Sequence, residues 1–126
     1  MSDVPQVEIL GRKHAILLPG LAEREEIILA LGDENASPAV KRRARAAALG
    51  LCTRLGRESG TTLAAHGYDV LAYGGAVYGW LREQGATMMD VAVQGNACID
   101  AVAMGLAPRE AEVESALGNS GAGEAS

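Results

Sequence analysis

A chain of 126 residues is long enough for a single domain with its own core. Its net charge of −5, from 16 acidic and 11 basic side chains, argues against nucleic-acid binding by the chain as a whole. Hydrophobic residues make up 48% of the chain and aromatic residues 3%, with no Phe, so we expect a core of aliphatic side chains and alanine in closely packed helices. The chain begins without the features of a signal peptide and has no apolar stretch as long as a membrane span, so we expect a cytoplasmic protein outside the membrane.

Two short apolar runs near the N-terminus predict a β-hairpin. Residues 7–10 and 15–18 are suited to strands, and the polar connector 11–14 between them begins with Gly11, which favours a turn. A two-stranded hairpin is marginal in water on its own, so we expect it to pack against helices. Its free edge is also a candidate for strand addition by a partner's sheet.

Helical periodicity begins at Leu21. The apolar residues of 21–31 recur at helical spacing, with acidic residues in the first turns that complement the helix dipole. Ser37 and Pro38 then open a second helix in the preferred order of N-cap and first helical residue. Its apolar stripe predicts one amphipathic helix as far as residue 55. The stripe consists of Val40, Ala44, Ala47, Ala48, Leu51 and Leu55.

A loop over residues 56–62 separates this helix from a third over 70–81, for which Asp69 is the expected N-cap. Glycines lower helix propensity by about 1 kcal/mol each relative to alanine, and they are tolerated where another backbone packs close. We therefore expect such a close approach along this helix. The glycines inside the helical pattern are Gly74, Gly75 and Gly79.

A capping box of Thr87 and Asp90 opens a fourth helix over 88–102, and Pro108 begins a short acidic helix. The last residues, 118–126, are rich in Gly, Ser and Ala and are expected to form a flexible tail. The expected fold class is therefore α+β and mostly α. An N-terminal β-hairpin precedes about five helices in a small bundle, which together form one domain over residues 1–117.

The sequence contains no arrangement typical of an active site or a metal centre. His14 and His66 have no patterned ligand partners. Cys52 and Cys98 lie far apart in apolar helical patterns, as is typical of small buried residues in a reducing compartment. The segment 57–62 superficially resembles a phosphate-binding loop, but it lacks a Lys after its glycine, and a plain connector explains it better. We expect a non-enzymatic protein without a cofactor or metal.

Charge is unevenly distributed along the chain. From Glu83 onward, seven acidic residues stand against the single basic Arg109. Such polarity favours head-to-tail self-association or docking on a partner of mixed charge, whereas the simpler explanation is the solvated face of an amphipathic helix. Six of the 11 basic residues lie in the second helix and just beyond it. They are Lys41, Arg42, Arg43, Arg45, Arg54 and Arg57.

All the aromatic residues lie between positions 68 and 80, and aromatic side chains often dominate interface energetics. Tyr78 belongs to the apolar stripe of its helix and is expected in the core, where a ring supplies bulk that alanine lacks. Tyr73 and Trp80 fall away from the centre of that stripe. The candidate partner-binding residues are therefore Tyr73, Trp80, Tyr68, Arg42 and Arg45.

The segment 68–81, followed by Gly85 and the helix over 89–95, resembles tail assembly chaperones of long-tailed bacteriophages and of related prophage or gene-transfer particles. Members of this family commonly carry an Asp-x-x-x-Tyr-Gly helix, which here begins at Asp69, and an acidic Glu-Ala-x-Val-Glu stretch, here residues 110–114. The resemblance covers most of residues 4–117. It implies a small protein that starts with a short strand pair and continues as helices.

The resemblance implies a non-enzymatic role in the host-cell cytoplasm. Such a chaperone binds the long, helical tape-measure protein, keeps it soluble and helps to recruit tail-tube subunits, so these two proteins are the expected partners. Homo-oligomers are compatible with the charge pattern. Two alternatives stay open: a structural head–tail connector or tail-completion protein that forms a ring, and a small nucleic-acid-binding regulator that uses the helix over 41–57.

Overall fold

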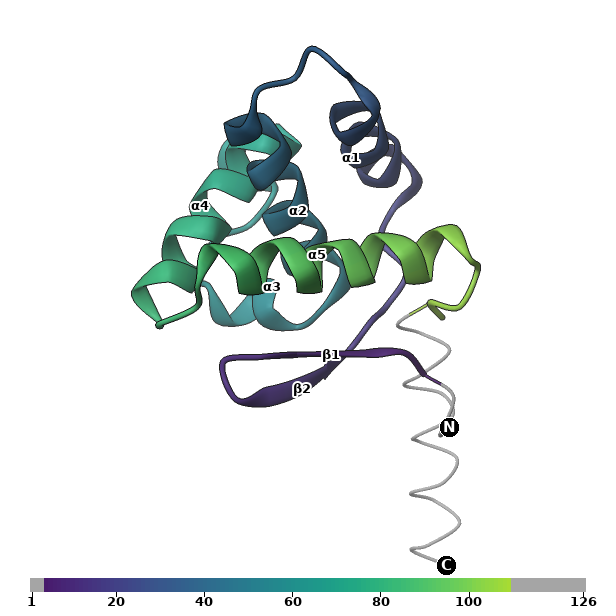
Figure 1. The fold of residues 1–126 in the computed structure, drawn as a ribbon, viewed down its shortest axis with the longest axis vertical. Coiled ribbons are helices and arrows are strands. Elements are labelled where there is room, and N and C mark those ends of the chain that lie inside the picture. The colour runs from purple at the N-terminus through teal and green to yellow at the C-terminus, as the bar shows by residue number, and fades with distance from the viewer. Residues whose placement is uncertain (1–3, 110–126) are drawn as a thin grey trace, which may run out of the picture.

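The computed structural model describes residues 4–109, and Figure 1 shows their arrangement. Within these residues, an antiparallel hairpin precedes five α-helices, which is the expected mostly helical α+β fold. Residues 110–126, which include most of the acidic helix expected from Pro108 and the tail 118–126, lie outside the described residues. The fifth helix is instead a short one after α2 that the sequence did not predict. The elements are β1 (Gln6–Ile9), β2 (Arg12–Ala15), α1 (Leu21–Gly32), α2 (Pro38–Cys52), α3 (Leu55–Glu58), a 3-10 turn (Ala64–His66), α4 (Val70–Glu83) and α5 (Met88–Ala103).

The hairpin turns earlier than the apolar runs predict. Ile9 pairs with Arg12, so Leu10 and Gly11 form a two-residue turn. Their φ angles are 57° and 74°. A two-residue turn with positive φ at both positions matches the twist of the two strands that it joins. The polar residues 12–14 therefore belong to β2, and the expected connector over 11–14 is wrong.

Residues 16–18, which the sequence assigns to the second strand, instead run past the C-terminal end of α2. The backbone N–H of Leu17 donates to the carbonyl of Cys52 at 2.6 Å, and that of Leu18 donates to the carbonyl of Pro108 at 2.7 Å. This buried connector therefore joins the hairpin, the end of α2 and the segment after α5.

Helix α2 lies at the centre of the bundle, with α1, α4 and α5 around it (Figure 1). The Oγ of Ser37 accepts a hydrogen bond from the N–H of Val40 at 3.2 Å, and Pro38 occupies the first turn, as predicted. Small side chains on several sides of α2 let three helices approach it closely. The buried residues of α2 are Ala44, Ala46, Ala47, Ala48, Leu49, Gly50 and Cys52.

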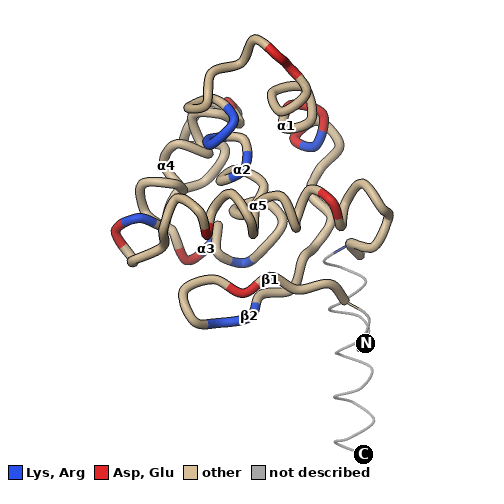
Figure 2. The backbone as a smooth tube through the Cα atoms, viewed as in Figure 1, with Lys and Arg blue, Asp and Glu red and all other residues tan. Residues whose placement is uncertain are grey.

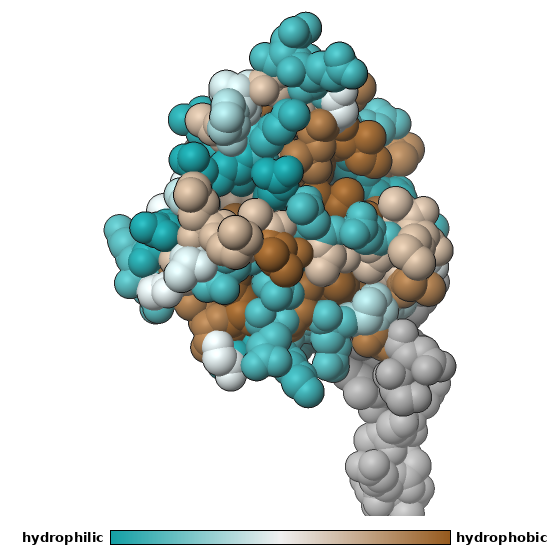
Figure 3. Space-filling view, viewed as in Figure 1, coloured by the Kyte–Doolittle hydropathy of each residue, from teal (hydrophilic) through white to brown (hydrophobic). Residues whose placement is uncertain are grey.

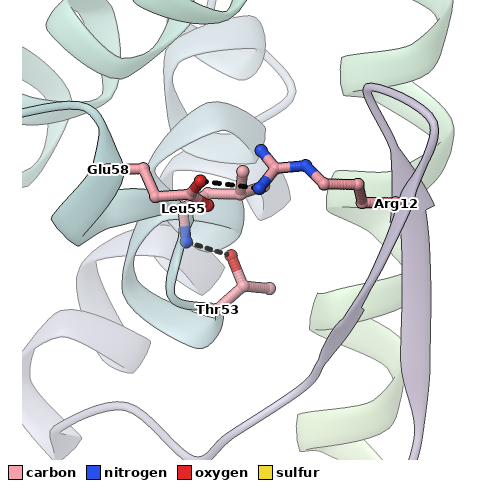
Figure 4. A network of polar contacts seen from close by, with 4 residues as sticks. All are labelled: Arg12, Thr53, Leu55 and Glu58. Carbon is pink, nitrogen blue, oxygen red and sulfur yellow. Dashed lines mark hydrogen bonds and ion pairs between the residues drawn. The ribbon is translucent and has the colours of Figure 1, made fainter.

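The long helix expected as far as Leu55 is interrupted at Thr53. The hydroxyl of Thr53 donates to the carbonyl of Leu49 at 2.6 Å. It also accepts from the N–H of Leu55 at 3.2 Å (Figure 4). A threonine hydroxyl that bonds the backbone in this way competes with the helical ladder. The chain therefore ends α2 at Cys52 and starts α3 at Leu55, and α3 extends over residues 56–58 of the segment predicted as a loop.

An ion pair fastens the hairpin to α3. Nη1 of Arg12 donates to Oε1 of Glu58 at 2.8 Å, with both side chains at the surface (Figure 4). Exposed pairs of this kind contribute only about 0.2–1 kcal/mol, so the pair orients the hairpin more than it stabilises the fold.

Gly74 and Gly95 mark the closest approaches of α4 and α5 to α2. A Cβ atom on Gly74 would overlap the backbone carbonyl of Arg43. A Cβ atom on Gly95 would lie 2.8 Å from the carbonyl oxygen of Arg45. The close approach expected along the third helix is therefore confirmed at Gly74, whereas Gly79 faces open space.

Thr87 and Asp90 form the predicted capping box at the start of α5. The Oγ1 of Thr87 accepts from the N–H of Asp90 at 3.0 Å, and Oδ2 of Asp90 accepts from the N–H of Thr87 at 2.9 Å. The backbone hydrogen bond first, and the Thr87 side chain second, lower the pKa of the Asp90 carboxyl below its ordinary value.

This lowered pKa makes part of the stability dependent on pH. A carboxyl whose pKa is depressed by folding contributes stability above its unfolded pKa of about 3.9, and the contribution is lost as the pH falls through the folded pKa. We expect the free energy of unfolding to fall less below about pH 4 in Asp90→Asn than in the wild type. Urea unfolding between about pH 2.5 and 6 measures this, with Thr87→Val expected to lie between the two. Equal slopes for all three proteins would contradict the assignment.

Candidate partner-binding surface

The structure separates the five residues that the sequence nominates for partner binding. Tyr68 is 71% exposed, at the turn before α4. Trp80 is partly buried and packs against the core. Arg42 and Arg45 lie half-buried on the outer side of α2. The two arginines share α2, and Tyr73 and Trp80 share α4.

The expectation that Tyr73 falls away from the centre of the apolar stripe is wrong, because its side chain is 3% exposed. A Cβ atom on Gly50 or on Gly56 would lie 2.6 Å from the Tyr73 hydroxyl oxygen, so the missing side chains at these glycines make room for the ring. The ring also meets that of His66 edge-on, with 6.3 Å between centroids. Burial first, and the nearby Cys52 second, raise the pKa of the Tyr73 phenol. Tyr73 therefore belongs to the core, and its ring offers little surface to a partner.

Tyr78, expected in the core, lies at its edge instead. The buried face of α4 is formed by Val70, Tyr73, Gly74, Val77 and Leu81. The buried face of α4 therefore includes Tyr73 in place of Tyr78, which the predicted stripe contained. The reason is that α2 approaches α4 at Gly74. Tyr78 then stands beside α2, where the Cζ of Arg42 lies 5.4 Å from the centroid of its ring. This is a cation–π contact.

Arg42 and Arg45 are each held against a neighbouring helix. Arg42 rests on Tyr78 of α4, and the Nε of Arg45 donates to Oδ1 of Asn96 on α5 at 3.0 Å. Within residues 4–109, none of the four basic residues of α2 forms an ion pair. Figure 2 shows them as blue segments in the N-terminal half of α2.

Two hollows open on either side of Arg42. One, of about 460 Å³, lies between α2 and α4, and its lining includes Arg43 and Tyr78. The other, of about 140 Å³, lies between α2 and α5, and its lining includes Arg45 and Met88. We call these five residues, Arg42, Arg43, Arg45, Tyr78 and Met88, the α2 surface.

Large apolar side chains are exposed on α1 and α5, as Figure 3 shows in brown over both helices. Ile27 is the only buried residue of α1, whose Leu21 and Ile28 are 63% and 54% exposed. Ile28 also lines a small apolar groove between α1, α2 and α5. On α5, Met89 is 69% and Val93 is 52% exposed. Exposed apolar surface of this kind is typical of interaction sites.

The outer edge of β1 is partly covered, which limits the expected strand addition. The N–H of Glu8, which faces away from β2, donates to Oε1 of Gln94 on α5 at 3.4 Å. A partner's strand would have to displace this side chain to pair with β1.

The two cysteines, far apart in the sequence, meet in the core between α2 and α5. Both are buried, as expected. A hydrogen bond with Cys52, together with burial, raises the pKa of the Cys98 thiol far above its ordinary value. Because the thiolate is the reactive form, this environment keeps Cys98 protonated and unreactive.

The hydroxyls of the segment 57–62 are used within the segment and its neighbours. The Oγ1 of Thr61 lies 2.7 Å from Nε2 of His66, and Oγ1 of Thr62 accepts from the N–H of Ala65 at 3.1 Å. The side chains of a plain connector satisfy the local backbone in this way.

Among residues 4–109, no group of three or more His, Cys, Asp or Glu side chains is placed to hold a metal ion. None of the helices in this part of the chain combines the length and the apolar character that crossing a membrane requires. Comparison of the chain with protein-family models, with curated proteins and with solved structures finds no match.

Proposed function

We propose that this protein is a tail assembly chaperone of a long-tailed bacteriophage or a related particle. In this role it binds the helical tape-measure protein in the host cytoplasm, keeps it soluble and helps to recruit tail-tube subunits. The role is non-enzymatic and needs no cofactor. The proposal rests on the resemblance over residues 68–95 and 110–114 and on the surface of the described helices.

The observation that carries the proposal is the exposure of large apolar side chains on α1. Leu21 and Ile28 are seven residues apart, so they lie on one face of the helix, and both are more than half exposed. The groove beside Ile28 is lined almost wholly by apolar residues of α1, α2 and α5. An amphipathic helix packs against exposed side chains of this kind through its own apolar residues at every third or fourth position. A long helical partner with an exposed apolar face would be kept soluble by this contact.

Co-purification tests the proposal. We expect the tagged full-length protein, expressed with the products of its neighbouring genes, to capture one very long helix-rich chain and smaller amounts of tail-tube protein. Ile28→Glu should lower this capture about tenfold, because a buried unpaired charge at an interface is strongly unfavourable. Mass spectrometry of the captured proteins gives the measurement.

Ala22→Glu provides the matched control, since it adds the same carboxylate to an exposed site on the same helix. The amount of the long helix-rich chain that Ala22→Glu captures should equal the amount captured by the wild type. Portal or head proteins in the captured fraction, together with a stable ring in isolation, would favour a head–tail connector instead. Capture of nucleic acid alone would favour a regulator.

A further inference from the structure

The α2 surface concentrates positive charge that residues 4–109 do not neutralise. Lys41 and Arg45 are four residues apart on the same helix face, an arrangement in which like charges repel and destabilise the helix. The first turn of α2 contains no acidic residue. Within residues 4–109, no ion pair offsets this repulsion.

The two central arginines are already held in place. The guanidinium of Arg42 lies over the ring of Tyr78, and Nε of Arg45 is fixed by Asn96, while no hydrogen bond within residues 4–109 is made by the Nη atoms of either arginine. Less side-chain entropy is lost when a carboxylate binds an arginine that is already ordered. Hydrogen bonds between a guanidinium and a carboxylate are also among the stronger ones in proteins.

Apolar side chains flank these charges on both sides. The hollow of about 460 Å³ lies beside Tyr78, and the hollow of about 140 Å³ lies beside Met88, which is 52% exposed. Arg42 and Arg45 are three residues apart, about one helical turn. A ligand that matches this surface needs carboxylates one turn apart, with apolar groups beside them.

We propose that the α2 surface binds an acidic amphipathic helix of a partner protein. Two carboxylates one turn apart on that helix would pair with Arg42 and Arg45, and apolar side chains would enter the hollows beside Tyr78 and Met88. This inference deepens the proposed function, on which it rests for the partner's identity. Nucleic acid fits less well, since only a few phosphates could be paired at a surface bordered by the apolar Met88.

A synthetic peptide tests the chemistry directly. The probe is a fluorescein-labelled helical peptide of about 20 residues with Glu at i and i+3 or i+4 along one side and Leu beside them, and its control peptide replaces every Glu by Gln. Fluorescence anisotropy with the full-length protein should show binding of the Glu peptide at least about tenfold tighter than the Gln peptide.

Charge reversal locates the site. Arg42→Glu and Arg45→Glu should each weaken binding of the Glu peptide about tenfold or more, and Arg42→Lys should weaken it less. Lys13→Glu, the same change of charge on the exposed face of β2, should change the affinity less than about twofold. Circular dichroism of each variant verifies that the fold is retained.

Three results would overturn the inference. They are equal binding of the Glu and Gln peptides, equal weakening by Lys13→Glu and Arg42→Glu, and tighter binding of a DNA duplex that Arg42→Glu abolishes. The proposed function is tested separately by co-purification. If the Glu peptide binds as expected but no tape-measure chain is captured, the proposed function fails and the inference stands. If Arg42→Glu leaves capture of that chain undiminished, the inference fails and the proposed function stands.

Discussion

Replacement of Gly74 by alanine should lower the free energy of unfolding by about 2 kcal/mol, although alanine is the better helix former by about 1 kcal/mol. The new methyl group would overlap the backbone carbonyl of Arg43 and lie 3.1 Å from the Cβ of Ala47. A backbone carbonyl in a helix cannot rotate away as a side chain can. Helix α4 would have to move off α2, with which it makes its most extensive contact.

The same helix supplies the control for this prediction. A Cβ atom on Gly79 would meet nothing within 4 Å, so Gly79→Ala should raise the free energy of unfolding by about 1 kcal/mol through helix propensity alone. Urea unfolding of the two variants and the wild type gives both values. Equal effects of the two substitutions would mean that α4 does not approach α2 at Gly74.

Removal of the Tyr73 ring should destabilise the domain by about 3–4 kcal/mol, as in other truncations of large buried side chains. The ring fills the space left beside Gly50 and Gly56, and Tyr73→Ala would leave a cavity that two glycines cannot fill. Thermal unfolding of Tyr73→Ala should therefore show a Tm lower by on the order of 10 °C.

Tyr68→Ala is the control, because the Tyr68 side chain is 71% exposed. It should change the free energy of unfolding by less than about 0.5 kcal/mol. A small effect of Tyr73→Ala together with loss of partner binding would restore Tyr73 as a contact residue and contradict its buried position. Trp80 and Tyr68 remain the aromatic candidates for direct partner contact.

Local signals in the sequence predicted where three of the helices begin. Ser37 caps α2 and Thr87 with Asp90 caps α5, while Asp69 caps α4 by accepting from the N–H groups of Leu71 and Ala72 at 3.1 Å each. Such caps join residues at most three positions apart, so the sequence pattern contains all the partners that they need. The mostly helical fold with an N-terminal hairpin followed from the same kind of short-range information.

The rotation of α4 could not be predicted in this way. Tyr73 and Tyr78 border the same apolar face, and the stripe that includes Tyr78 is as regular as the one that includes Tyr73. The choice depends on the groove that α2 and α3 offer, which is formed by Gly50, Gly56 and the approach of Gly74 to Arg43. Residues far apart in the chain make that groove, so periodicity within one helix carries no information about it.

The sequence by itself determined the basic residues of the α2 surface, since they are consecutive or nearly so in the chain. Only the tertiary structure decided how these residues are grouped. It placed Arg42 over Tyr78, bonded Arg45 to Asn96 and set Met88 beside both. The physical reason is that helix caps and periodicity are satisfied within a few residues, whereas the grouping of side chains from three helices depends on where small residues let those helices meet.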